Sequence, residues 1–167
     1  MGIEIERKYL VKKEKWRSHK QQLQNQSSEV GLKYCQSYLP TQDNTTVRVR
    51  TVGKQGYLTI KSKVVGYTRS EFEYPIPVED AEQMLETLCF QPAIEKVRYK
   101  IKYGNLIWEV DEFLGENQGL IIAEIELESE AQLIDIPDWI DREVNDNRYF
   151  NSNLMKYPYS KWNESEK

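Results

Sequence analysis

The feature of this 167-residue chain that most restricts its fold is a two-residue alternation of charged and apolar side chains. Residues two apart in a β-strand point to the same side of the sheet, so each alternating run predicts a strand with one charged and one apolar face. Glycine-containing connections between several runs indicate hairpins. The expected strands cover residues 3–11, 34–39, 45–52, 57–64, 70–76, 95–103, 105–113 and 120–127.

The spacing of these runs predicts a mainly β fold of the α+β class, an antiparallel meander that is able to close into a barrel. Helical periodicity predicts a helix over residues 13–23, with Trp16 and Leu23 toward the body, and another over 78–88. Ser129 followed by Gln132 is a capping-box pattern and predicts a short helix that Pro137 ends. The remaining tail, residues 141–167, is expected to be irregular or to form short helices packed on the barrel.

Composition restricts the surroundings and partners of the chain. A charged fraction of 30% and an aromatic fraction of 11% are typical of one folded domain, and the net charge of −4 gives no general attraction to nucleic acid or anionic membranes. Cys35 and Cys89 do not form a CxxC pair, which favours free thiols in a reducing compartment. Neither a signal peptide nor a membrane-spanning run is evident. We expect a cytoplasmic protein that binds neither nucleic acid nor membrane.

The charged faces of the expected strands carry pairs of like charge. An ordinary sheet with one wet face explains any single strand, but like charges side by side repel, and seven strands share this pattern. A polyanion with divalent metal ions would relieve the repulsion, because cations hold phosphates while carboxylates hold the metals. The paired charges include Glu4 and Glu6, Arg48 and Arg50, Lys61 and Lys63, Glu71 and Glu73, Lys96 and Arg98, Glu109 and Asp111, and Glu124 and Glu126.

The alternation leaves open which face of the barrel is charged. If the charged face points outward, the apolar residues fill the barrel. If it points inward, the apolar residues face outward and need cover, which the helices and the tail supply only in part. A second copy of the chain would supply more, so a homodimer is one expectation.

The pattern Glu4-x-Glu6-x-Lys8 resembles the signature of the CYTH superfamily, also called the triphosphate tunnel metalloenzymes. The resemblance implies an eight-stranded antiparallel β-barrel that forms a tunnel, with charged faces inward, a few helices packed outside and a single CYTH-like domain over residues 1–167. Matching segments follow in order along almost the whole chain: Tyr34–Leu39, Val47–Arg50, Leu58–Lys61, Glu71–Tyr74, Glu95–Tyr99, Trp108–Asp111 and Ala123–Leu127.

The same resemblance implies a metal-dependent hydrolase of triphosphates. The small-molecule substrate it favours is inorganic tripolyphosphate, cleaved to pyrophosphate and phosphate by metal-activated water with Mg²⁺ or Mn²⁺. A CYTH-type adenylate cyclase, which converts ATP to cyclic AMP, and a thiamine triphosphatase are the alternatives among enzymes. A polyphosphate-binding module is the alternative outside them, although a pure anion binder gains nothing from so many carboxylates.

Resemblance and strand facing together assign roles to the charged residues. The expected metal ligands are Glu4, Glu6, Asp111, Glu124 and Glu126. The expected substrate-binding residues are Arg48, Arg50, Lys61, Lys63, Lys96 and Arg98. Lys8 is expected to act in catalysis with Glu4 and Glu6. His19, the only histidine, lies in a Lys- and Gln-rich segment and is expected to be exposed, which leaves no histidine-based chemistry.

Overall fold

The computed structural model describes residues 2–27 and 30–167, and its chain is mainly β-strand. Within these residues the strands are β1 (Gly2–Val11), β2 (Leu32–Leu39), β3 (Thr46–Val52), β4 (Gln55–Lys61), β5 (Thr68–Ile76), β6 (Ile94–Tyr103), β7 (Leu106–Phe113), β8 (Ile121–Glu126) and β9 (Ile140–Val144). The helices are α1 (Lys13–Gln26), α2 (Val78–Thr87) and α3 (Asn151–Lys156), with single 3₁₀ turns η1 (Gly115–Asn117), η2 (Asn147–Tyr149) and η3 (Tyr159–Lys161).

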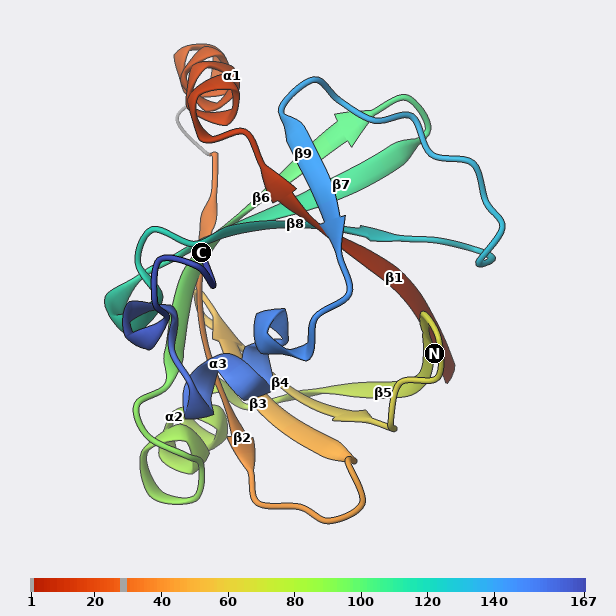
Figure 1. The fold of residues 1–167 in the computed structure, drawn as a ribbon. Helices are drawn as coiled ribbons and strands as arrows, with labels where there is room; N and C mark the ends of the chain where they lie inside the picture. The colour runs from red at the N-terminus through yellow and green to blue at the C-terminus, as the bar shows by residue number, and fades with distance from the viewer. Residues whose placement is uncertain (1, 28–29) are drawn as a thin grey trace.

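The strands form one antiparallel sheet in the order β5-β4-β3-β2-β6-β7-β8-β1-β9 (Figure 1). Pairing of β1 with β5 joins the two ends of the first eight strands and closes them into a barrel. The predicted eight-stranded antiparallel barrel is therefore confirmed. The ninth strand lies outside the closed ring, because β9 pairs only with the second half of β1.

The register of the strands settles which face points inward. Lys8 is opposite Glu124 across β1 and β8, and Glu4 is opposite Arg69 across β1 and β5. Lys8, Glu124 and Glu4 are buried and Arg69 is half-buried although they belong to the polar face, whereas Ile3, on the other face of β1, is 70% exposed. The charged faces therefore line the inside of the barrel, as the family resemblance implies.

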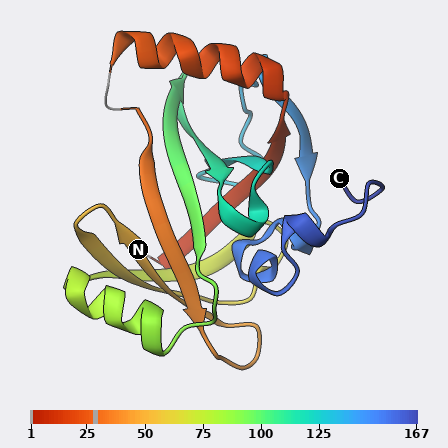
Figure 2. The ribbon, with the colours of Figure 1, turned by 90° about the vertical axis from the view of Figure 1, so that its left-hand side faces the viewer.

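The helices α1 and α2 lie against the outside of the barrel (Figure 2) and cover part of its apolar face. Trp16 of α1 is fully buried and packs edge-on against Tyr99 of β6, and α2 packs on β3 and β4 through Ala81. Trp16 and Leu23 face the body as predicted. Leu88, which was expected on the buried face with Ala81, follows the last residue of α2 and is 57% exposed.

The C-terminal segment closes one end of the barrel. Tyr149, Leu154 and Trp162 form an apolar cluster with inward-facing residues of the strands, among them Phe113 and Ile122. Figure 1 looks along the barrel and shows α3 within its outline. Short helices were expected in this tail, but the expectation that all of residues 141–167 lack a strand is wrong, since β9 covers Ile140–Val144.

Two further local predictions are wrong. Residues 129–137 form a turn and an irregular segment instead of a helix, because Glu130 is bound to the backbone NH of Tyr67 and the hydroxyl of Thr68. A helix limited to this length by Pro137 is too short to compensate for that contact. In the second case, the strand expected to reach residue 64 ends at Lys61, and a bridge between Val65 and Thr68 follows it.

His19 is also not where the sequence predicts it. It is half-buried, and its ring stacks on Trp139 with the ring centroids 5.9 Å apart. Trp16 of α1 and Trp139, which precedes β9, pack against this side chain and bury it in part. Cys35 and Cys89 are free thiols in the cluster beneath α2, as expected. Among the described residues, no helix is both long and apolar enough to cross a membrane.

Candidate active site

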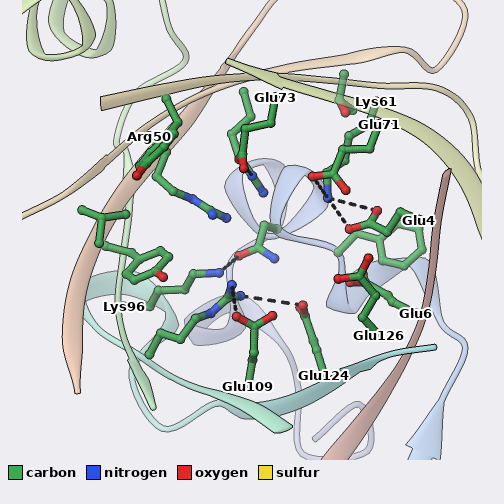
Figure 3. Close-up of a pocket in the computed structure, with 18 of the residues that line it drawn as sticks. Glu4, Glu6, Arg50, Lys61, Glu71, Glu73, Lys96, Glu109, Glu124 and Glu126 are labelled. Carbon is green, nitrogen blue, oxygen red and sulfur yellow. Dashed lines mark hydrogen bonds and ion pairs between the residues drawn. The ribbon is translucent and has the colours of Figure 1, made fainter. Parts of the chain in front are cut away.

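A cavity of about 390 Å³ runs into the barrel and is lined by side chains from all eight barrel strands and from the chain at α3. Arg50 and Lys96 point into the cavity from one side, while Glu4, Glu6 and Glu126 point into it from the other (Figure 3). Each side also holds charges of the other sign, since Lys61 contacts Glu4 and Glu109 contacts Arg98. The cavity therefore has one wall richer in cations, the cation wall, and a facing wall richer in carboxylates, the carboxylate wall.

Arg50 is the cation of this cavity that lacks a counter-charge. Its Nε donates a hydrogen bond to Oε1 of Gln36 at 3.1 Å, and its guanidinium lies 4.9 Å from the centre of the Tyr34 ring. In the described part of the chain, no carboxylate is within salt-bridge distance of it. Burial, together with nearby Arg48 and Arg98, lowers the pKa of Arg50 to about 9. An anion placed beside Arg50 would relieve this strain.

Arg98 and Lys96 are held in place by one carboxylate, Asp111. The guanidinium of Arg98 donates two hydrogen bonds to Asp111, at 2.7 and 2.8 Å, and Nζ of Lys96 lies 2.7 Å from the same carboxylate. Asp111 is completely buried behind these cations and is not among the residues that line the cavity. Asp111, which the sequence predicts to be a metal ligand, thus contacts Arg98 and Lys96 and holds these two candidate phosphate-binding residues in position.

Glu4 stands between two cations on the opposite wall. It accepts hydrogen bonds from Nζ of Lys61 at 2.9 Å and from Nε of Arg69 at 2.8 Å. Burial raises the pKa of this carboxyl, but the charges of Lys61 and Arg69 outweigh burial and lower it to about 2. Lys61 and Arg69 therefore favour the ionised form of Glu4.

Lys8 bridges the carboxylates of the first and last barrel strands. Its Nζ lies 2.7 Å from Glu124 and 3.1 Å from Glu6. Burial alone would lower the pKa of Lys8, but the two carboxylates raise it above its usual value. Burial alone would raise the pKa of Glu124. The positive charges of Lys8, Arg98 and Lys96 outweigh burial and hold this pKa well below its ordinary value.

Glu6 and Glu126 are carboxylates of this wall whose pKa is raised, although Glu6 lies 3.1 Å from Nζ of Lys8. They are opposite each other across β1 and β8. Burial and the neighbouring carboxylates, Glu124 for Glu6 and Glu4 for Glu126, raise the pKa of both groups. A bound cation would reverse this shift, so these two carboxylates are the groups that best fit a metal.

The donor set suits a hard divalent cation, because all of its members are carboxylate oxygens. In the described residues, however, no three acidic, cysteine or histidine side chains converge closely enough to form a ready metal site. The contacts above give the reason, since Glu4 and Glu124 are each occupied by lysine or arginine. Chemistry and charge therefore fit a metal at this wall, while its full ligand set is not assembled.

Most of the remaining predicted residues also line the cavity. Arg48 and Lys61 do so, and Arg48 approaches Thr59 and Glu73 through one guanidinium nitrogen. Lys63 does not: it follows the end of β4, is exposed, and lines a neighbouring pocket instead. Its predicted partnership with Lys61 in substrate binding required the strand to continue two residues further.

Sequence reasoning missed several residues of the site. Arg69 faces Glu4, and its signal is the alternation Arg69-x-Glu71-x-Glu73, which extends the predicted strand by one residue. Tyr34, two residues before Gln36 on the same face of β2, separates Arg50 from Arg98, with ring-centre distances of 4.9 and 5.1 Å. Phe150, Asn151 and Ser152 reach the cavity from the C-terminal segment, and no local pattern signals this long-range contact.

A closed antiparallel barrel whose interior holds facing walls of cations and carboxylates defines a class of tunnel proteins suited to polyanions and metal ions. The model of the CYTH domain family matches residues 2–154. The chain belongs to the CYTH domain family, and this membership implies a divalent metal ion.

Known relatives extend the likeness over nearly the full chain. A protein of Acetivibrio thermocellus named inorganic triphosphatase is 47% identical over 165 residues, which are 98% of this chain and all of the relative. The solved structure of the inorganic triphosphatase NE1496 has 30% identity and a TM-score of 0.59, covering 90% of this chain and 96% of its own. The PH1012 protein of Pyrococcus horikoshii OT3, at 19% identity, shares the fold with a TM-score of 0.55 over 76% of this chain and 79% of its own.

Proposed function

We propose that this protein hydrolyses inorganic tripolyphosphate to pyrophosphate and phosphate in the charged tunnel, with Mg²⁺ or Mn²⁺ as the divalent ion. The full-length relative at 47% identity and the solved relative at 30% identity, both named inorganic triphosphatases, support the substrate. The two free thiols fit a reducing cytoplasm as the place of action.

The observation that carries the proposal is the unbalanced cation on one wall opposite unbalanced carboxylates on the other. Arg50 has a lowered pKa and Glu6 a raised one, so each wall disfavours its own charge. A polyphosphate held at Arg50 supplies the missing negative charge. A divalent ion held by Glu6 and Glu126 would supply the missing positive charge. Either partner alone corrects only half of the imbalance.

The residues of the cation wall bind and orient the substrate. Arg50 and Arg98 suit bidentate contacts to phosphate oxygens, and Gln36 and Asp111 fix the direction of their guanidinium groups. Lys96 adds a compact charge beside them. Fixed donors of this kind stabilise charge without reorganising during the reaction, so they lower the barrier for transfer of a phosphoryl group.

Lys8 is the cation closest to the carboxylates of the other wall, and its contact with Glu124 fixes its position. We assign it to the phosphoryl group that is cleaved, where its charge stabilises the developing negative charge. The divalent ion, when bound, lowers the pKa of a water molecule and shields phosphate charge. Glu4, Glu6, Glu124 and Glu126 are the side chains that would hold it.

A substrate panel with each metal tests the proposal. Tripolyphosphate, pyrophosphate, ATP and thiamine triphosphate are compared by phosphate release, and ATP also by cyclic AMP formation. We expect the highest kcat/KM for tripolyphosphate and no activity after chelation. Arg50→Ala should raise KM for tripolyphosphate more than it lowers kcat. Preferred turnover of ATP to cyclic AMP would instead support the cyclase, and binding without turnover would support a polyphosphate-binding module.

A further inference from the structure

A second pocket, which we call the far pocket, lies behind the wall of the tunnel formed by α3. It has a volume of about 400 Å³ and is bounded by the end of β2, residues 40–46, the chain after β4 and the C-terminal segment. Tyr38, Thr46, Arg69, Phe150 and Ser152 line both cavities. The tunnel and the far pocket are therefore separated by single side chains.

The charge of the far pocket is opposite to that of the whole protein. Three cations line it, Lys63, Arg69 and Lys156, whereas no carboxylate is among the described residues that do so. The chain as a whole has a net charge of −4, and seven glutamates are among the described residues that line the tunnel next to it. Such a local excess of positive charge favours anions.

The uncharged residues of the far pocket suit a phosphate in particular. Hydroxyl groups of threonine and serine and the side-chain amides of asparagine stand among the cations and are able to donate hydrogen bonds to phosphate oxygens. These residues are Thr45, Thr46, Ser152, Asn44 and Asn147, whereas Thr41, Ser62 and Asn153 already donate to backbone carbonyls. Lysine binds phosphate as a compact point charge, so two mobile lysines need no rigid geometry to hold it.

Arg69 connects the two cavities. Its Nε is committed to Glu4 at 2.8 Å, on the carboxylate wall of the tunnel, while the side chain also lines the far pocket. Arg69 therefore belongs to both cavities, whereas Lys63 and Lys156 line only the far pocket.

We propose that the far pocket is a second anion site that binds inorganic phosphate, and that orthophosphate released in the tunnel passes through it. The binding of phosphate is independent of catalysis, whereas its role as an exit rests on the proposed function. Hydrolysis of tripolyphosphate by water yields one pyrophosphate and one orthophosphate, and orthophosphate, the smaller product, is the one that we assign to the far pocket.

Binding is tested first, without turnover. Orthophosphate is titrated in EDTA into the wild type, Lys63→Ala/Lys156→Ala and the matched control Lys13→Ala/Lys15→Ala, which removes two exposed lysines of α1. Backbone amide resonances of Ser62, Lys63 and Asn153 should shift in the wild type and in the control, and phosphate affinity should fall about fivefold or more in the far-pocket variant. Equal affinities in all three proteins would overturn the site.

A crystal soaked with tungstate, a heavy tetrahedral anion, gives an independent position. Anomalous density between Lys63, Lys156 and Arg69 is expected, and density confined to the tunnel would contradict the proposal. Kinetics then test the exit. Lys63→Ala/Lys156→Ala should keep KM for tripolyphosphate and weaken product inhibition by orthophosphate. If the double variant has a raised KM for tripolyphosphate and an unchanged affinity for orthophosphate, Lys63 binds the substrate and the second site is overturned.

These results separate the two proposals. Phosphate binding in the far pocket of a protein that does not hydrolyse tripolyphosphate would leave the anion site in place and refute the proposed function. Hydrolysis of tripolyphosphate by a protein whose far pocket binds no phosphate would support the proposed function and refute the second anion site.

Discussion

Lys96 and Asp111 form an ion pair of 2.7 Å in which neither side chain is exposed to solvent. Two buried charges of this kind lose their hydration, and the pair is tolerated because Asp111 also accepts two hydrogen bonds from Arg98. Asp111 thus holds two cations of the cavity wall, and its removal would take the ion-pair partner from Lys96 and the two shortest contacts from Arg98, which would keep only Glu109 at 3.2 Å and Glu124 at 3.7 Å.

Asp111→Asn is therefore expected to destabilise the fold. Loss of one partner from a buried charge network costs about 3–5 kcal/mol in the free energy of unfolding, which urea denaturation measures. Glu109→Gln is the control, since Glu109 contacts Arg98 at 3.2 Å from a more exposed position and its loss should cost about 1 kcal/mol or less. Unchanged stability with a large loss of metal affinity would show that Asp111 is a metal ligand, as the sequence predicts.

Lys96 should make substrate binding depend on pH. Burial lowers the pKa of this ammonium group, Asp111 opposes the shift only in part, and the result is about 7. The charge of Lys96 is thus lost as the pH rises through 7, and affinity for tripolyphosphate falls. Because bound phosphate favours the charged form, binding above pH 7 should also take up a proton. Calorimetry in EDTA, in buffers of different ionisation enthalpy, measures both effects.

Lys96→Arg supplies the control for that experiment. Arginine keeps its charge across this range, so the variant should bind tripolyphosphate without the additional proton. The protonation of tripolyphosphate itself is common to both proteins and cancels in the comparison. Identical proton uptake by the two proteins would mean that Lys96 does not titrate on binding.

The sequence predicts the barrel and its charged faces well because both depend on local alternation. Glu4, Glu6 and Lys8 share a face at any register of the strand, so their facing does not depend on tertiary structure. Whether that face points into the barrel or out of it does depend on tertiary structure, because it depends on what covers the apolar face. Only the family resemblance predicted the inward direction. β9 escaped notice because Asp141, Arg142 and Glu143 separate its only two apolar residues.

The errors within the site have a different origin, namely the limits of the strands. Placing the start of β5 at Ser70 hid Arg69, and extending β4 beyond Lys61 placed Lys63 in the tunnel. Asp111 points to the predicted face of its strand. The alternation of residues does not show how deeply a side chain is buried, and Asp111 is too deeply buried to line the cavity. Contacts such as that of Lys96 with Asn151, at 3.2 Å, join residues 55 positions apart and leave no local signal.

Metal affinity should weaken on acidification at a higher pH than an ordinary carboxylate would require. Burial and neighbouring carboxylates raise the pKa of Glu6 and of Glu126, so protons compete for these groups above their usual range. Titration of Mn²⁺, followed by electron paramagnetic resonance, should show affinity falling as the pH is lowered, with the fall beginning above the range usual for a glutamate. Glu126→Gln should bind Mn²⁺ more weakly at pH 7 and lose less affinity on acidification. A variant with an unaltered pH profile would exclude Glu126 from the metal site.

Tyr34 should matter for substrate binding although it carries no charge. Its buried ring lies between the guanidinium groups of Arg50 and Arg98, 4.9 and 5.1 Å from its centre, and so keeps two like charges apart at a fixed spacing. Contacts of this kind are worth about 0.5–2 kcal/mol each. Loss of both in Tyr34→Leu should raise KM for tripolyphosphate about tenfold, because the arginines no longer stand ready for two phosphate groups.

Tyr34→Phe tests whether the ring or the hydroxyl is responsible. The phenylalanine ring keeps both contacts, so KM should stay within about twofold of the wild type. Melting temperatures of the two variants show whether the barrel is intact. If Tyr34→Phe raises KM as much as Tyr34→Leu does, the hydroxyl binds substrate or a neighbouring residue, and the ring is not the spacer. A loss of kcat with unchanged KM in Tyr34→Leu would place its effect in the transition state, where the spacing of the two arginines is matched to the reacting phosphates.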